Sequence, residues 1–338
     1  MESPVRIGIL GTGGIAIRAL VEPAPAVPDV EVHSVASREP ERAAAFAAAH
    51  GVTTSTSYER LLADPDIDVV YVTLPNSLHA EWSIRALEAG KHVLCEKPMS
   101  ANAVEAQQVT EAVERTGRVY LEAMHYLHHP FYRRIREVVD SGVLGEVTSV
   151  EDRFEIPERF VTPDNIRRDF ALGGGALMDA GCYSVHFLRH LLGEPAAVLA
   201  ATAQTDPDDP QVDLGMSATL AFPDGRTGVV RASFLGEDTA GAMTTVRGSA
   251  GTLEIAWIYV PQWGGKLRII IGDTVVEEAA DPTPTYVFQL RELVRCVRDG
   301  APVLTSADDG ALTMRAVDRI YEAAGLARRG TSAPSASD

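Results

Sequence analysis

The first part of the chain alternates short apolar runs with amphipathic segments. The apolar runs predict strands at residues 5–10, 30–36, 52–53, 68–73, 92–95 and 119–123. The segments between them predict helices at 41–50, 58–63, 80–89 and 104–115, and Gly90 and Gly117 predict C-terminal helix caps. Strict alternation of strand and helix is typical of a doubly wound parallel sheet.

A different pattern begins beyond Pro130. A helix at 131–141 is followed by strand-like runs, which lie at residues 146–156, 197–204, 214–222, 226–234, 244–247, 251–258, 266–271 and 274–278. Turns such as Pro223-Asp224-Gly225 between neighbouring runs predict hairpins and a largely antiparallel sheet. Two helices, at 286–299 and 308–327, end the pattern.

These patterns predict an α/β fold class with two domains. An N-terminal Rossmann domain with a doubly wound parallel sheet spans residues 1–125, and a C-terminal α+β domain with a large, mostly antiparallel sheet spans 126–328. The second domain is expected to bind substrate and to form oligomers. Residues 329–338 are small and polar, which predicts a disordered tail.

Composition narrows the classes of function. A net charge of -17 over 338 residues argues against nucleic-acid or anionic-membrane partners, because both require a basic surface. The three cysteines, Cys95, Cys182 and Cys296, fit neither a disulfide framework nor a zinc cluster, which favours a reducing compartment. The sequence shows neither a long apolar span nor an export signal, so we expect a cytoplasmic protein that acts on small molecules.

The turn after the first strand has the glycine spacing of a dinucleotide site. Gly11 allows the tight turn, Gly13 lets the backbone approach a pyrophosphate, and the small Ala16 lets the helix pack closely on the strand. A helix beginning here offers unpaired N–H groups to phosphates. A structural glycine turn is the alternative.

The end of the second strand predicts which cofactor is preferred. Ser37 and Arg38 stand where a carboxylate would bind the ribose 2′-hydroxyl of NAD(H). A serine hydroxyl and a guanidinium bind a 2′-phosphate instead, so NADP(H) is preferred, with NAD(H) as the second choice. Arg42 adds a second cation unless it is a solvated helix residue.

Two further strands end in residues that carry chemistry. The strand at 68–73 runs into Leu74–His79, read as a loop in which Pro75 stops the ladder and Asn76 offers an amide. The strand at 92–95 ends at Glu96-Lys97-Pro98. Ligands bind at the carboxyl edge of a parallel sheet, so Lys97 is a candidate proton-transfer group or anion holder. A surface turn with a solvated ion pair is the alternative.

A glycine run in the second half leads into a further candidate site. Gly173-Gly174-Gly175 permits close backbone approach to a ligand, and the helix that follows carries Asp179 and Tyr183 four residues apart, on one face. A lysine, an aspartate and a tyrosine in one cleft would form a proton relay, because a nearby cation lowers the pKa of a tyrosine. A core tyrosine on a buried helix is the alternative.

The histidines leave alternatives open. His186 is a reserve acid/base or, more simply, a hydrogen-bonded structural residue. The cluster of His125, His128 and His129 has no carboxylate at a helpful spacing, so no metal site is predicted.

These motifs together carry a resemblance to a known family. The glycine turn at 11–16, Leu-Pro-Asn-x-x-His at 74–79, Cys-Glu-Lys-Pro at 95–98 and the run from Gly173 to Tyr183 resemble the Gfo/Idh/MocA oxidoreductases over residues 5–327. Within that family the chain is most similar to the dimeric dihydrodiol dehydrogenases and the NADP-dependent sugar dehydrogenases. The family usually has a histidine at the position of Tyr183, whereas the dihydrodiol branch has a tyrosine there.

The resemblance implies an NADP(H)-dependent oxidoreductase that interconverts a secondary alcohol and a ketone on a sugar, cyclitol or cyclic diol. Lys97 would polarise the oxygen, Tyr183 would be the acid/base, and Asp179 would orient it or bind substrate. The implied substrate contacts are Lys97, His125, Asp179 and Tyr183. The implied cofactor contacts are Gly11, Thr12, Gly13, Gly14, Ile15, Ser37, Arg38, Arg42, Leu74, Pro75, Asn76, His79, Glu96, Lys97 and Arg167.

Two departures from the family pattern and two rival functions accompany this interpretation. Leu127 stands where the family usually has arginine, and Ile166 replaces a tryptophan before Arg167. Arg167 is a candidate cofactor or substrate contact, with an exposed, salt-bridged arginine as the alternative. One rival is an enzyme that recycles a tightly bound NAD(P) while it eliminates or hydrolyses a glycoside. The other is a non-catalytic NADP(H) sensor. A homodimer or homotetramer is expected.

Overall fold

The computed structural model describes residues 3–54, 57–237 and 241–330. The chain forms two compact units. Unit 1 contains Met1–Ser100, Val104–His128 and Tyr286–Ala311, and unit 2 contains Ala101–Ala103, His129–Thr285 and Leu312–Asp338. The division at His128 lies near the expected boundary at residue 125, and residues 286–311 return to unit 1 from a part of the sequence assigned to the second domain.

Unit 1 contains a six-stranded sheet in the order β3-β2-β1-β4-β5-β6. Its strands are β1 (Val5–Leu10), β2 (Val30–Ala36), β3 (Thr53–Thr54), β4 (Val69–Val72), β5 (His92–Cys95) and β6 (Tyr120–Glu122). All neighbouring pairs are parallel, which confirms the predicted doubly wound sheet. The strand order reverses between β1 and β4, and ligands of open α/β sheets bind at such a switch point.

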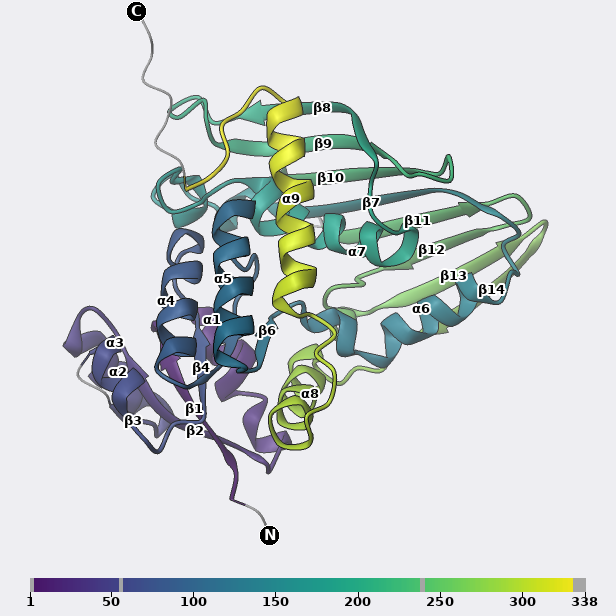
Figure 1. Cartoon of the computed structure of the whole chain (residues 1–338). Helices are drawn as coiled ribbons and strands as arrows, with labels where there is room; N and C mark the ends of the chain where they lie inside the picture. Colours follow the sequence, from purple (N-terminus) through teal and green to yellow (C-terminus); the bar gives the residue numbers. More distant parts are fainter. Residues whose placement is uncertain (1–2, 55–56, 238–240, 331–338) are drawn as a thin grey trace, which may run out of the picture. The chain divides into compact units, whose positions relative to one another are not determined.

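Unit 1 also contains several helices, drawn with the sheet in Figure 1. They are α1 (Gly14–Ala16), the π-helix η1 (Ile17–Val21), η2 (Ala24–Ala26), α2 (Pro40–His50), α3 (Tyr58–Ala63), α4 (Asn76–Glu88), α5 (Ala103–Thr116), η3 (His125–His128) and α8 (Thr285–Asp299). One apolar cluster joins Ile7 and Ile9 of β1 with Leu20 of η1 and with Leu290 and Leu293 of α8. Burial of both sheet faces explains why the strands are nearly continuous apolar runs.

The start of α4 differs from the prediction. The sequence interpretation placed a loop at 74–79 and a helix from residue 80, whereas α4 begins at Asn76 with Pro75 as its N-cap. Proline fixes its own φ and has no N–H to donate, so it fits at the start of a helix. The connection between β4 and α4 can therefore be short. The first turn of α4 therefore lies directly after β4.

Unit 2 contains an eight-stranded sheet in the order β14-β13-β12-β11-β7-β10-β9-β8. Its strands are β7 (Val147–Pro157), β8 (Ala197–Thr205), β9 (Asp213–Ala221), β10 (Thr227–Gly236), β11 (Ala242–Gly248), β12 (Thr252–Ala256), β13 (Lys266–Ile271) and β14 (Thr274–Ala279). The pair β7–β10 is parallel and the other six are antiparallel, which confirms a mostly antiparallel sheet. The predicted turn at 223–225 joins the antiparallel pair β9–β10.

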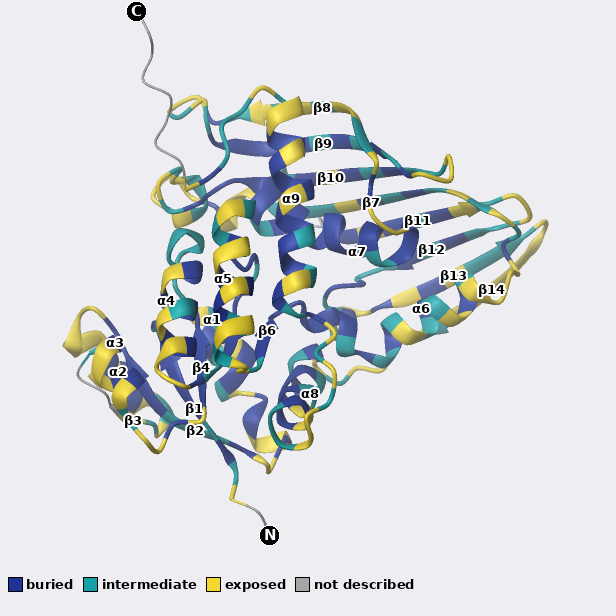
Figure 2. Ribbon diagram, viewed as in Figure 1, coloured by how far each residue is buried: buried dark blue, intermediate teal, exposed yellow. Residues whose placement is uncertain are grey.

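A central helix packs on this sheet. The π-helix η6 (Leu177–Gly181) continues into α7 (Cys182–Leu192), and both contact β7 and β10. Figure 2 shows α7 as a buried helix, whereas the edge strand β14 is largely exposed. The remaining helices are α6 (Pro130–Asp140), η4 (Glu158–Phe160), η5 (Ile166–Arg168), η7 (Pro261–Trp263) and α9 (Ala307–Ala323), whose last part belongs to unit 2.

The end of the described chain corrects one expectation. Arg329, placed by the sequence at the start of a disordered tail, is fully buried and forms an ion pair with Asp213. The buried carboxylate of Asp213 pairs with the charge of Arg329 and so allows this arginine to be buried. Gly330 is exposed, and the rest of the predicted tail, residues 331–338, lies outside the described residues. Within the described ranges, no helix combines the length and apolar character needed to cross a bilayer.

Candidate functional site

The glycine turn after β1 has the backbone shape that its sequence predicts. Gly11 has a φ of +105°, and its N–H donates to the carbonyl of Ala36 at 2.9 Å. A side chain there would have its Cβ 2.8 Å from the hydroxyl of Thr73, so both conformation and space require glycine. Gly13 and Gly14 are exposed, and Thr12 and Ile15 are half-buried. The turn therefore presents open backbone beside the switch point of the sheet.

The end of β2 places two predicted residues in different environments. Ser37 is buried, and its hydroxyl lies 3.4 Å from the N–H of Glu39. Arg38 is exposed, and Arg42 is an exposed residue of α2 that makes a long contact of 3.9 Å with Glu39. A contact of that length between exposed groups is weak. The guanidinium groups of Arg38 and Arg42 are thus both exposed beyond the end of β2.

His79 occupies a position that its sequence did not reveal. Its side chain is buried, with Nδ1 2.7 Å from the carbonyl oxygen of Pro98 and Nε2 2.7 Å from that of Leu74. Burial lowers the pKa of His79, and the two carbonyls and Glu96 oppose that change. The ring bridges the turns that follow β4 and β5, so it acts as a brace for those turns and has no ring nitrogen left for a cofactor.

Glu96 and Lys97 do not form the solvated surface pair that was the simpler alternative. Glu96 is buried, accepts a hydrogen bond from the hydroxyl of Tyr71, and has its pKa raised by burial. Lys97 is half-buried at the end of β5. Tyr286 of α8 lies within electrostatic range of Glu96, and burial raises its pKa. The lysine is therefore held next to a buried carboxyl. Leu74, Pro75 and Asn76 are half-buried at the neighbouring strand end.

The histidine cluster at 125–129 separates into different roles. His125 is buried in unit 1, with its ring centroid 4.3 Å from that of Tyr286. His129 caps α6 in unit 2, where its Nδ1 accepts from the N–H of Phe131 at 3.0 Å and its Nε2 lies 3.1 Å from the carbonyl of Thr283. Burial lowers the pKa of His129. These contacts give His129 a structural role.

Two of the predicted site residues of unit 2, Asp179 and Arg167, form an ion pair. The Nε of Arg167 donates to Oδ2 of Asp179 at 2.6 Å, and Asp179 raises the pKa of Arg167. Asp179 lies in η6, which is a π-helix. The four-residue spacing of Asp179 and Tyr183 places them on one face only in a regular α-helix. Arg167, predicted to contact the cofactor, thus holds the Asp179 carboxylate.

Tyr183 is packed in an aromatic cluster. It is buried, with ring centroids 4.8 Å from Tyr259 and 5.9 Å from Phe154. The hydroxyl of Tyr259 donates at 2.7 Å to Asp152, a fully buried carboxyl that also accepts from the hydroxyl of Ser184. Burial raises the pKa of Asp152. This network holds Tyr259, on which the ring of Tyr183 packs, and Ser184, the next residue of α7.

The glycine run does not serve the purpose predicted for it. A Cβ on Gly174 would lie 2.6 Å from the carbonyl oxygen of Arg167, and one on Gly175 would lie 2.2 Å from Oδ1 of Asp213. The close approach that these glycines allow is therefore to the protein itself. A glycine run indicates that backbone approaches another group closely, but it does not identify that group.

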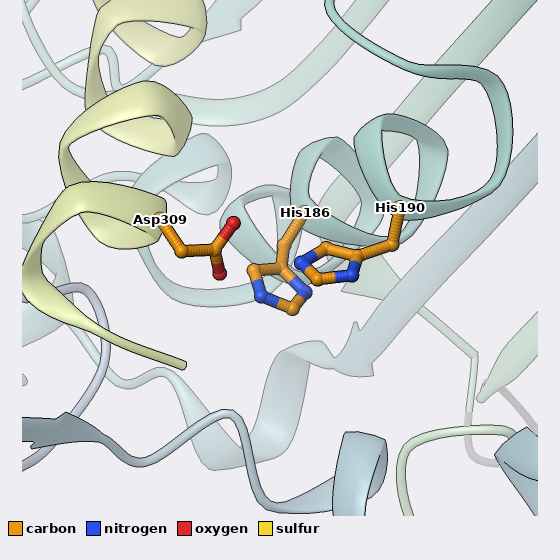
Figure 3. A group of neighbouring side chains, drawn as sticks. All are labelled: His186, His190 and Asp309. Carbon is orange, nitrogen blue, oxygen red and sulfur yellow. The ribbon is translucent and has the colours of Figure 1, made fainter. Parts of the chain in front are cut away.

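His186 and His190 are stacked one turn apart on α7 (Figure 3). Their ring centroids are 4.3 Å apart, and His186 is fully buried. Asp309, also labelled there, belongs to unit 1. The packing of His186 favours the structural role over that of a reserve acid/base.

Some groups of these sites were missed by the sequence interpretation. They include Tyr71 in β4, Asp152 in β7, Asp213 in β9 and Arg329 beyond α9. Tyr71 and Asp152 carried a weak signal, because each is a polar group within a run that reads as a buried strand. Asp213 and Arg329 lie far apart in sequence, and no local pattern pairs them.

Residues 5–124 match the family described as "Oxidoreductase family, NAD-binding Rossmann fold" (GFO_IDH_MocA). Residues 132–254 match its C-terminal domain. The chain belongs to the Gfo/Idh/MocA oxidoreductase family. This membership confirms the resemblance seen in the sequence and identifies the chain as an NAD(P)-dependent oxidoreductase.

The three relatives of this Gfo/Idh/MocA member described next cover between 68% and 95% of its length. D-xylose 1-dehydrogenase (NADP(+)) 2 of Haloferax volcanii is 39% identical over 94% of the chain and 96% of its own. Trans-1,2-dihydrobenzene-1,2-diol dehydrogenase of Xenopus tropicalis is 32% identical over 68% of both chains. The 3-ketoreductase KijD10 of Actinomadura kijaniata, solved with NADP and TDP-benzene, is 30% identical over 95% and 98% of the two chains, with a TM-score of 0.87.

Proposed function

We propose that the chain is an NADP(H)-dependent oxidoreductase that interconverts a secondary alcohol and a ketone on a sugar, cyclitol or cyclic diol. The observation that carries the cofactor choice is the chemistry at the end of β2, where a buried hydroxyl and an exposed guanidinium follow the strand. A carboxylate at that position would repel a 2′-phosphate, whereas Ser37 and Arg38 favour one. NAD(H) remains the second choice.

In this proposal the open glycine turn holds the pyrophosphate and Arg38 pairs with the 2′-phosphate. When bound, the cofactor accepts or supplies the hydride. Lys97 donates a hydrogen bond to the substrate oxygen, which stabilises negative charge as the carbon changes hybridisation. Tyr183 takes the proton in oxidation and returns it in reduction.

Asp179 has an orienting role in the same proposal. Its 2.6 Å ion pair with Arg167 fixes one carboxylate oxygen and leaves the helical turn before Tyr183 in a defined position. The other carboxylate oxygen is a suitable acceptor for a substrate hydroxyl. Arg167 then contributes through Asp179 and has no direct part in proton transfer.

The relatives support the substrate class, and solved variants of one relative concern a lysine and a tyrosine. Two of them are a D-xylose dehydrogenase and a 3-ketoreductase, and the latter was solved with NADP. Variants of that 3-ketoreductase in which a lysine or a tyrosine is replaced were also solved with NADP and TDP-benzene. A polyol or sugar-like substrate follows as the class to screen.

The test combines cofactor binding with turnover. NADPH binding to Lys97→Ala and Tyr183→Phe is measured by fluorescence titration, and oxidation of sugars, cyclitols and dihydrodiols with NADP+ is followed by absorbance. We expect kcat to fall about 100-fold or more in both variants, the usual scale for a lost acid/base group. NADPH affinity should stay within a few-fold, and Lys266→Ala, an exposed strand residue, serves as the control.

Turnover that survives in both variants would contradict the assigned roles. Substrate conversion without a stoichiometric change in nicotinamide absorbance would instead identify an enzyme that recycles its cofactor internally. Tight NADPH binding by the wild-type chain without turnover of any substrate class would identify a sensor.

We also infer a homodimer or homotetramer. In the eight-stranded sheet, Met243 of β11 pairs with Arg153 of β7, and both side chains are exposed. On the same face of the sheet, Val275 of β14 is also exposed. An open sheet face of this kind favours a symmetric partner. Light scattering of the purified protein distinguishes dimer and tetramer from a monomer, which would contradict the inference.

A further inference from the structure

A fully buried ion pair of unit 2 lies beside the glycine run. Nη2 of Arg329 donates to Oδ1 of Asp213 at 2.7 Å, and both side chains have 0% exposure. The Nε of Arg329 donates to the carbonyl of Gly174 at 2.6 Å. Its guanidinium lies over the ring of Tyr321, 4.1 Å from the centroid, and 5.0 Å from the ring of Phe170. One arginine therefore contacts a strand, the glycine run and α9.

The carboxylate of this pair extends the contact to the helix. Oδ2 of Asp213 accepts from the N–H of Leu177, the first residue of η6, at 2.7 Å. The hydroxyl of Tyr321 donates to Oδ1 of the same carboxylate at 2.9 Å. Asp213 thus satisfies a backbone N–H at the start of the helical segment that carries Asp179 and Tyr183.

A second set of contacts closes the same turn from the other side. The N–H of Gly175 donates to the carbonyl of Arg167 at 2.9 Å, and the side chain of Arg167 holds Asp179. Gly174 and Gly175 have no room for a Cβ between these two sets of contacts. The start of η6 is therefore fixed between Arg167 and the Asp213–Arg329 pair.

We propose that Asp213 and Arg329 are positioning residues for the reaction, because they hold the helical turn that presents Asp179 and Tyr183. The inference rests on the function proposed above for these two residues. It assigns a role in the site to the final described segment of the chain, which the sequence placed in a polar tail.

The chemistry of the pair favours orientation over simple stability. Burying two charges costs desolvation energy, and apolar residues of similar volume often stabilise a fold as well or better. An apolar pair would leave the Gly174 carbonyl and the Leu177 N–H without these partners. The planar fork of arginine reaches several acceptors at fixed angles, which lysine does not reproduce.

The experiment compares full-length Arg329→Gln, Arg329→Lys and Asp213→Asn with Arg328→Gln as the matched control. Arg328 is the adjacent arginine, and its ion pair with Glu322 is exposed. We expect kcat to fall at least 10-fold in Arg329→Gln and Asp213→Asn, with NADPH affinity within two-fold of wild type. Hydrogen exchange should accelerate in residues 173–183 and stay unchanged in residues 5–16. Arg329→Lys keeps the positive charge. Its kcat and its exchange rates at residues 173–183 should lie between those of Arg329→Gln and those of wild type.

The outcomes separate this inference from the proposed function. Wild-type kcat and wild-type exchange at 173–183 in folded Arg329→Lys would overturn the positioning role. An equal loss in Arg328→Gln would also overturn it. If Tyr183→Phe keeps full activity, the proposed function fails, whereas faster exchange at 173–183 in the Arg329 variants would still show that the pair holds the turn.

Discussion

Replacing Gly175 by alanine tests how tightly the turn before η6 is packed. Gly175 has a φ of +133°, and adopting it costs an alanine about 1–3 kcal/mol. The new Cβ would lie 2.2 Å from Oδ1 of Asp213 and 2.9 Å from Nη2 of Arg329, so it must displace the ion pair. Breaking a buried ion pair costs about 3–5 kcal/mol. The sum, about 4–8 kcal/mol, is comparable to the whole stability of a typical domain.

A matched control isolates the packing contribution. Gly193 ends α7 with a φ of +90°, and a Cβ there would meet nothing within 4 Å. Gly193→Ala should therefore cost only the conformational part, about 1–3 kcal/mol. The assay is urea unfolding followed by tryptophan fluorescence and by circular dichroism. If Gly175→Ala unfolds at the same urea concentration as Gly193→Ala, the close approach has no energetic weight and the reasoning is refuted.

Three further predictions concern individual side chains. Arg38→Ala should weaken NADPH binding about 10- to 100-fold, the worth of one charge-assisted contact, and leave NADH binding unchanged; equal losses in titrations with the two cofactors would contradict the 2′-phosphate assignment. His79→Leu should lower the free energy of unfolding by about 1–3 kcal/mol, because the neutral ring has one N–H and one buried carbonyl loses that donor, and a loss below about 0.5 kcal/mol in urea unfolding would exclude the bracing role. Burial raises the pKa of Asp152, so the folded state favours the protonated carboxyl and loses stability as the pH rises above the unfolded value of about 3.9. Asp152→Asn should remove this loss, and parallel urea curves for the two proteins between about pH 4 and pH 8 would contradict it.

Much of the fold could be predicted because local patterns determine it. The strands of unit 1 are buried on both faces, so each appears in the sequence as a short apolar run between helical segments. Turn residues at 223–225 were sufficient to predict the β9–β10 hairpin. The glycine turn was equally readable, since a positive φ at Gly11 leaves few other residues that fit.

The candidate site was less predictable because long-range contacts decide it. Arg167 looked like a cofactor contact, but a carboxylate twelve residues away holds it. His79 looked like a ligand in a loop, whereas a proline at the helix start moves it into α4, between two carbonyls. Asp213 and Arg329 are separated by 116 residues, and their pairing depends on the packing of strands and helices that no local pattern contains.

The discontinuity of unit 1 has a consequence for synthesis of the protein on the ribosome. Val287, Leu290, Leu293 and Val294 of α8 belong to the same apolar cluster as the first strand. When the parallel sheet has been translated, that side of its core still lacks α8, and all of the eight-stranded sheet must be made before residues 286–311 emerge. Because domains tend to fold as they emerge, the nascent N-terminal unit waits with apolar surface uncovered while unit 2 is translated. Chaperones that bind exposed apolar segments therefore have a long interval in which to act. A truncation before residue 286 would also remove α8, which is part of the core of unit 1.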